Sequence, residues 1–107
     1  MNQAPVGPEP SVVHDDAAQQ FRVRLAGGLD GVLRYEWAGE PQTGPRVMRL
    51  MHARVPEALR GHAQGGVLME AVLTEIRAMG VLVTPICGYT QAYMTRHAAR
   101  WGHLLAA

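Results

Sequence analysis

In the first half of the chain, apolar residues alternate with polar ones most clearly at residues 21–25. Residues 21–25 and 32–37 each follow this pattern, and a turn containing glycines separates them. Alternation with a period of two is typical of strands with one buried face, and the Asp30-Gly31 pair favours a hairpin. Within residues 12–20 we expect a short strand followed by a turn at 14–16. This half of the chain therefore predicts an antiparallel meander.

A run of mostly apolar residues, 46–55, follows a turn at 39–45 and leads into a helical pattern. Such a run suits a strand buried on both faces, and Pro56 ends it because proline lacks a backbone N–H. From Val67 the apolar period becomes helical, and Gly80 stands where a left-handed C-cap would end the helix. The predicted buried side of this helix consists of Met69, Val72, Leu73, Ile76 and Met79.

A further strand, residues 81–86, follows the helix. A strand, helix and strand with this spacing normally form a crossover that makes the two strands parallel. Residues 89–97 predict a second, short helix, after which Trp101, Leu104 and Leu105 pack a final turn. The predicted fold is α/β, with a mixed, mostly antiparallel sheet, a βαβ crossover and two main helices.

Length and composition indicate one domain, residues 12–107, behind a flexible N-terminal tail, residues 1–11. The net charge of +1 provides no basic field for nucleic acid, and all ten basic residues are arginine. No run approaches the roughly 20 apolar residues of a membrane span, and no signal peptide is visible. A single cysteine excludes an internal disulfide. We therefore expect a cytoplasmic monomer or homodimer that binds neither nucleic acid nor membrane.

The junction between the apolar run and the helix is a candidate anion site. The first N–H groups of a helix lack intrahelical partners, and the helix dipole favours negative charge there. Glycines let a ligand approach the backbone, although a turn that merely needs glycines would look the same. The spacing fits neither a P-loop nor the dinucleotide fingerprint. The candidates are Arg60, Gly61, His62, Ala63, Gln64, Gly65 and Gly66.

Residues 60–65 resemble the pyrophosphate loop of GNAT acetyltransferases, Arg/Gln-x-x-Gly-x-Gly/Ala. The resemblance extends to the His52-x-x-Val-Pro strand end, the Pro85-x-Cys87 strand exit and a tyrosine helix that ends at His97. This order is similar to the minimal single-domain branch of the GNAT superfamily. Ala63 replaces the second loop glycine, which strains the chain if φ is positive there but is harmless in the right-handed region. Gly88 also departs from the family, which has proline after the cysteine.

The resemblance implies that the two parallel strands diverge and that the gap receives the pantetheine arm of acetyl-CoA. It implies acetyl transfer to an amine by direct attack, without a metal. The loop would hold the pyrophosphate, with Tyr89 nearby. Backbone amides of Ala53, Arg54 and Val55 would bind the pantetheine arm and polarise the acetyl carbonyl.

Three side chains are candidates for the chemistry. The resemblance makes Tyr93 the general acid for the departing thiolate, although a partly buried structural tyrosine is the alternative. His52 is a tentative general base because imidazole titrates near neutral pH, or else a structural histidine. Cys87 could carry the acyl group if its thiol pKa is lowered, and otherwise it is a small hydrophobe that lines the pocket.

Two other function classes stay open. A CoA- or acyl-CoA-binding module without catalysis is favoured by the lack of a matched glutamate base and of helices that would wall the acceptor site. A pure interaction protein would use its arginines for an acidic partner. No cluster has metal-ligand spacing, and the amine acceptor, a small molecule or a protein, is unassigned.

Overall fold

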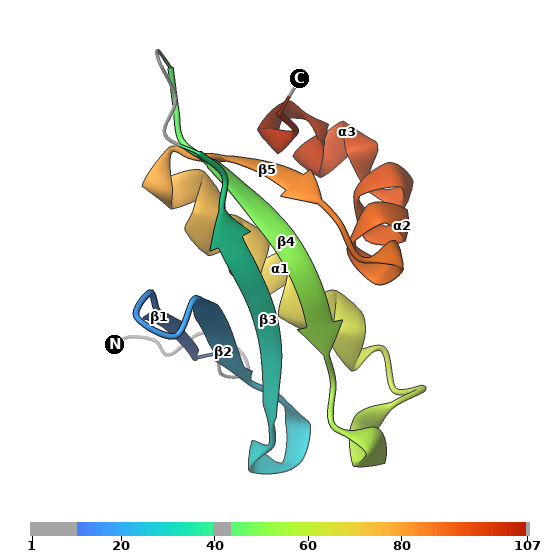
Figure 1. Cartoon of the computed structure of the whole chain (residues 1–107). Coiled ribbons are helices and arrows are strands. Elements are labelled where there is room, and N and C mark those ends of the chain that lie inside the picture. The colour runs from blue at the N-terminus through green and yellow to red at the C-terminus, as the bar shows by residue number, and fades with distance from the viewer. Residues whose placement is uncertain (1–10, 40–43, 107) are drawn as a thin grey trace, which may run out of the picture.

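The computed structural model of the protein describes residues 11–39 and 44–106, which build one five-stranded sheet (Figure 1). The first four strands pair antiparallel in sequence order, and the fifth pairs parallel with the fourth. The predicted meander and mixed sheet are confirmed. The strands are β1 (Val12–Asp15), β2 (Gln20–Arg24), β3 (Asp30–Trp37), β4 (Val47–Arg54) and β5 (Leu82–Pro85).

The predicted tail, residues 1–11, lies outside the described residues except for Ser11, and so do positions 40–43 of the predicted turn. Ser11 precedes β1 and is tied to β2, because its carbonyl accepts a 2.9 Å hydrogen bond from the Arg24 amide. The turn expected at 14–16 begins later, since β1 extends to Asp15. Asp16 then accepts hydrogen bonds from the Tyr35 hydroxyl and, at 2.9 Å, from the Trp37 indole, which hold the corner against β3.

Both predicted helices are present. The longer one starts before the apolar period does, and it ends at Gly80, whose φ of 74° confirms the left-handed cap. Met79 is 38% exposed, contrary to expectation, because it lies in the last turn, where the chain already leaves the core; Leu68 is buried instead. The helices are α1 (Gln64–Met79), α2 (Gly88–Arg96) and α3 (Ala98–Trp101), with short 3-10 turns η1 (Ala26–Gly28), η2 (Glu57–Leu59) and η3 (Gly102–Leu104).

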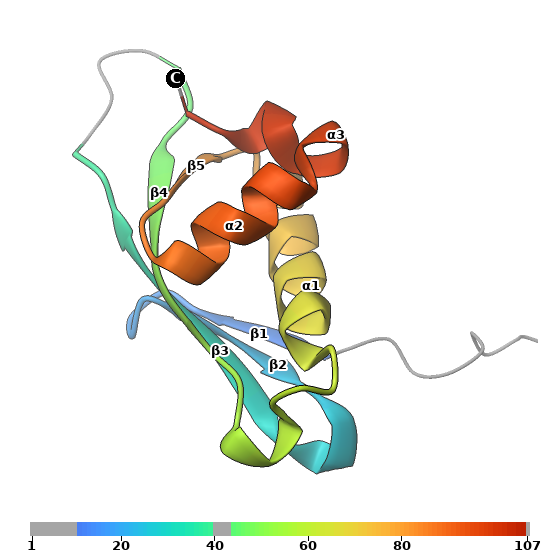
Figure 2. The ribbon, with the colours of Figure 1, turned by 90° about the vertical axis from the view of Figure 1, so that its right-hand side faces the viewer.

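All three helices lie on one side of the sheet (Figure 2). Alternate strand residues turn towards them, so the core forms between this face and α1. The expectation that residues 46–55 are buried on both faces is wrong: no described element covers the other face, and His52 and Arg54 are exposed on it. The strand side of the core consists of Phe21, Val23, Leu25, Leu33, Tyr35, Met48, Leu50 and Val83.

The two parallel strands diverge, as predicted. Their pairing ends where Leu50 meets Pro85, and the Leu50 carbonyl accepts from the amides of Ile86 at 2.9 Å and Cys87 at 3.4 Å. Pro85 has no N–H to donate, and the chain turns away into α2, while β4 continues to Arg54. The last part of β4 therefore has no strand neighbour on the β5 side.

Candidate functional site

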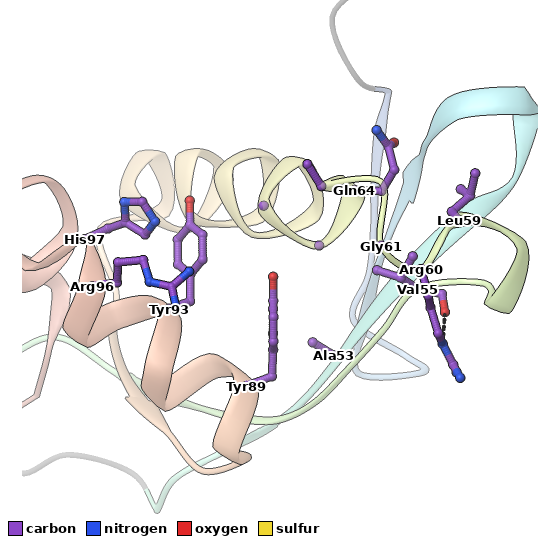
Figure 3. Close-up of a pocket in the computed structure, with 13 residues that line it drawn as sticks. Ala53, Val55, Leu59, Arg60, Gly61, Gln64, Tyr89, Tyr93, Arg96 and His97 are labelled. Carbon is purple, nitrogen blue, oxygen red and sulfur yellow. Dashed lines mark hydrogen bonds between the residues drawn. The ribbon is translucent and has the colours of Figure 1, made fainter.

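A cavity of about 510 Å³ opens where the end of β4, the start of α1 and one side of α2 meet (Figure 3). The divergence of β4 from β5 leaves this space. Most of the residues predicted from the sequence line it, although they come from three separate elements. They are Ala53, Val55, Arg60, Gly61, Ala63, Gln64, Gly65, Gly66, Tyr89 and Tyr93.

The loop before α1 presents a helix N-terminus to the cavity. Gly61 has φ of 84°, and Ala63, the N-cap, has φ of 61° and ψ of 16°. The amides of Gln64, Gly65 and Gly66 begin the helix and have no intrahelical acceptor. The Ala63 methyl group supplies no capping oxygen either, so the positive end of the helix dipole is open to the cavity.

Ala63 is in the left-handed region, so the alternative in which alanine is harmless does not apply. We expect Ala63→Gly to raise the free energy of unfolding by about 0.5–1 kcal/mol, because glycine adopts this conformation without strain. Urea denaturation of both proteins measures the difference. The matched control is Ala78→Gly inside α1, which we expect to destabilise by about 0.5–1 kcal/mol. If Ala63→Gly lowers the free energy of unfolding as much as Ala78→Gly does, the backbone at Ala63 is not strained.

The charge of the cavity suits an anion. Arg60 and Arg96 line it, and no described lining residue is a carboxylate. Arg60 Nε donates to the Val55 carbonyl at 3.3 Å, which holds this side chain across the end of β4. Gln64 Oε1 accepts from the Ala26 amide at 3.1 Å and ties the start of α1 to the β2–β3 connection. The cavity therefore combines two guanidinium groups with an uncapped helix N-terminus.

Tyr89 stands across the middle of the cavity. Its ring rises from α2 between the Tyr93 side and the loop of Arg60 and Gly61 (Figure 3). A Cβ built on Gly65 would lie 2.9 Å from the ring carbon Cζ and closer still to the hydroxyl. Gly65 therefore permits this close approach of the tyrosine to α1. Burial raises the pKa of Tyr89, which the charge of Arg96 partly opposes.

Tyr93 is held by a polar network that joins α1, α2 and α3. Its hydroxyl donates to Glu70 at 3.4 Å, and the Trp101 indole donates to the same carboxylate oxygen at 3.2 Å. Arg100 forms an ion pair with Glu70, and the His97 ring lies 4.3 Å from that of Tyr93, centroid to centroid. Burial, and then the charge and hydrogen bond of Glu70, raise the pKa of Tyr93. The phenol therefore stays protonated.

Glu70, Arg96 and His97 were not predicted as site residues. Glu70 lies 23 positions before Tyr93, and its place on the polar side of α1 indicates only solvent exposure. The resemblance included His97 merely as a helix residue, whereas it lines the cavity together with Arg96. The spacing of Tyr93, Arg96 and His97 on one helix was the available signal, because residues three and four apart share a face.

Cys87 caps α2 beside the cavity. Its sulfur accepts a hydrogen bond from the Thr90 amide at 3.4 Å. Partial burial raises the pKa of the thiol, but hydrogen bonds from Thr90, Ala53 and Tyr89 outweigh this and lower it overall. The Cys87 amide also donates to the Leu50 carbonyl at 3.4 Å, so this residue links the two diverging elements.

Three predicted residues point elsewhere. His52 pairs with Arg34 and Arg54 with Val32, on the uncovered face of the sheet, and His62 is exposed in the loop. None of them lines the cavity. In residues 11–39 and 44–106, no three His, Cys, Asp or Glu side chains gather as metal ligands. No helix in the same ranges is long and apolar enough to cross a membrane.

Comparison with known proteins identifies the family. The sequence profile described as GCN5-related N-acetyl-transferase matches residues 20–104. Protein NATD1 of Gallus gallus is 36% identical over 84 residues, which cover 78% of this chain and 72% of the relative. Protein NATD1 of Homo sapiens is also 36% identical, over 78% of this chain and 70% of its own length. The match runs from β2 through the glycine loop and the Tyr93 helix to η3, and the chain therefore belongs to the GCN5-related N-acetyltransferase family.

Proposed function

We propose that this protein transfers the acetyl group of acetyl-CoA to an amine. The observation that carries the proposal is the uncapped N-terminus of α1, which opens with two arginines onto the cavity beside the diverging strands. A pyrophosphate suits this place, because backbone N–H groups and guanidinium groups both bind phosphate oxygens. The gap between β4 and β5 then offers a passage for a thioester arm.

Each cavity residue has a role that its position supports. The amides of Gln64, Gly65 and Gly66, with Arg60 and Arg96, bind the phosphates. Tyr89 contacts the arm between the loop and Tyr93, and the backbone at Val55 orients it. Cys87 caps α2 and orders the strand exit, a role that needs no acyl intermediate.

The chemistry is a direct transfer. His52 takes a proton from an ammonium acceptor that approaches from the uncovered face, and the free amine attacks the thioester carbonyl. The C–N bond forms, the C–S bond breaks, and Tyr93 donates its phenol proton to the departing sulfur. The proton lost from the new amide nitrogen restores Tyr93 through solvent. An ammonium and a thioester thus give an amide, a thiol and one free proton.

A second candidate function is binding of CoA or acyl-CoA without turnover. One observation favours it: the Tyr93 hydroxyl already donates to Glu70 at 3.4 Å. Both functions require ligand in the same cavity. Turnover of acetyl-CoA with amines distinguishes them.

The first test is isothermal titration of the protein with acetyl-CoA and with CoA. We expect a dissociation constant in the micromolar range, which corresponds to about −8 kcal/mol. Ala63→Trp should abolish the binding because Ala63 lines the cavity, whereas Ala58→Trp, exposed in η2 and outside the lining, should retain it. If neither ligand binds at millimolar concentration, or if both variants bind as the wild type does, the site assignment fails.

A further inference from the structure

The uncovered face of the sheet carries a patch of arginine side chains. Figure 1 looks onto this face, with α1 behind the sheet. Residues that pair across neighbouring strands share a face, so the register places five arginines here together with His52. The arginines are Arg22, Arg24, Arg34, Arg49 and Arg54.

Three of these arginines already have partners on the same face. Arg22 pairs with Asp15 at 3.5 Å, Arg24 with Asp30 at 2.8 Å, and Arg49 with Glu36 at 3.5 Å. These pairs use every carboxylate that the register places on this face. Excess positive charge therefore remains on the face.

The excess charge is concentrated around His52. Arg34 lies directly opposite His52 on β3, and Arg54 lies two residues further along β4. Neither arginine forms an ion pair with any residue in the described ranges, and both are exposed. Two guanidinium groups without carboxylate partners thus flank the proposed base.

This patch lies beside the gap through which an acceptor would reach the thioester. β5 leaves β4 after Leu50, so His52 and Arg54 are on the part of β4 that has lost its neighbour. Ala53, between them, faces the cavity on the other side. An amine held at His52 is therefore one residue along β4 from the cavity-lining Ala53, on the opposite face of the strand.

We propose that the acceptor is an acidic polypeptide segment, whose carboxylates bind Arg34 and Arg54 while its amine lies at His52. This inference rests on the proposed function and adds its substrate class. Charge complementarity selects an anionic partner, because guanidinium forks match carboxylates. The open form of the face selects a polypeptide, since no described element walls off a pocket for a small molecule, and exposed ion pairs are individually weak. Several carboxylates on one segment offset that weakness.

The test uses the full chain and two synthetic peptides, one with a lysine among glutamates and the other with glutamines in their place. We expect kcat/KM for the glutamate peptide to be about tenfold higher. Raising the ionic strength from about 0.01 to about 0.1 M shortens the Debye length from about 30 to about 10 Å and should reduce this preference. Fluorescence anisotropy of the labelled peptides, without acetyl-CoA, measures the same preference as binding.

Variants locate the preference on the sheet. We expect Arg34→Gln combined with Arg54→Gln to reduce the preference to about twofold or less, with unchanged affinity for CoA. Arg77→Gln, which removes one positive charge from an exposed position on α1, is the control and should leave the preference intact. Arg34→Glu combined with Arg54→Glu should favour a peptide with arginines in place of glutamates, a gain that misfolding cannot produce.

The outcomes separate this inference from the transferase proposal. Salt-sensitive binding of the glutamate peptide that is lost in the double variant supports the acidic partner even if no acetyl group is transferred. Equal acetylation of both peptides overturns the acidic partner while transfer itself stands. No binding preference in the wild type, or a preference unchanged in the double variant, overturns it as well.

Discussion

Replacing Tyr93 by phenylalanine is expected to lower kcat about 100-fold, while the affinity for acetyl-CoA stays nearly constant. A positioned general acid contributes roughly 10²–10⁴-fold, and the hydroxyl is the only group that the change removes. The ring, which lines the cavity and stacks near His97, is retained. CoA release from acetyl-CoA in the presence of the glutamate peptide measures kcat, and isothermal titration measures the affinity.

The pH dependence gives an independent check on the same residue. Burial and Glu70 raise the pKa of Tyr93 above its ordinary value of about 10, so the acid form persists through neutral and mildly alkaline pH. Activity limited by loss of this proton should therefore fall only above about pH 10. Glu70→Gln removes the carboxylate charge, which lowers the pKa of Tyr93 and should move the alkaline limb to lower pH.

Two results would contradict this role. A kcat of Tyr93→Phe within about twofold of the wild type would leave Tyr93 a structural residue. An alkaline limb that does not move in Glu70→Gln would show that another group limits the rate. Tyr35→Phe serves as the control, because it also removes a tyrosine hydroxyl but lies away from the cavity, bonded to Asp16, and should keep the wild-type kcat.

The second large effect concerns stability. Trp101→Ala should lower the free energy of unfolding by about 3–5 kcal/mol, as expected for deleting a large buried aromatic side chain. Trp101 is fully buried, and its indole N–H donates to Glu70. The guanidinium carbons of Arg77 and Arg100 also lie 5.1 and 4.9 Å from its ring centroid, so the loss affects contacts from both α1 and α3. Because small domains are stable by about 5–15 kcal/mol, this is a large share of the total.

Urea denaturation with a common slope measures this change. Leu105→Ala is the matched control, because Leu105 belongs to the same C-terminal segment but is 40% exposed, and we expect it to cost less than about 1 kcal/mol. If both variants lose a similar free energy of unfolding, the packing of Trp101 contributes no more to stability than that of the partly exposed Leu105.

The sequence predicted elements whose signals are local. Alternation indicated β2 and β3, the change of period indicated α1, and Gly80 marked its end. These elements could be predicted because a periodic pattern and a left-handed helix cap each depend only on a few neighbouring residues. The position of Ala63 also follows from the family loop, but only the tertiary structure decides between its strained and relaxed conformations.

The sequence could not predict contacts between residues far apart in the chain. Glu70 meets Tyr93 and Trp101 across 23 and 31 positions, and no local pattern reports such a meeting. The same limitation applies to Cys87, whose amide donates to the Leu50 carbonyl because the exit of β5 lies against β4. The contact with Glu70 raises the pKa of Tyr93.

By itself, then, the sequence determined that this chain forms a meander, a glycine loop and a βαβ unit of the acetyltransferase family. Only the tertiary structure decided which side of the sheet each candidate occupies. Ala53 faces the cavity, whereas the neighbouring His52 lies with Arg34 on the uncovered face. The physical reason is that the alternation of a strand defines two faces but does not say which one the helices will cover, because that depends on packing between distant segments.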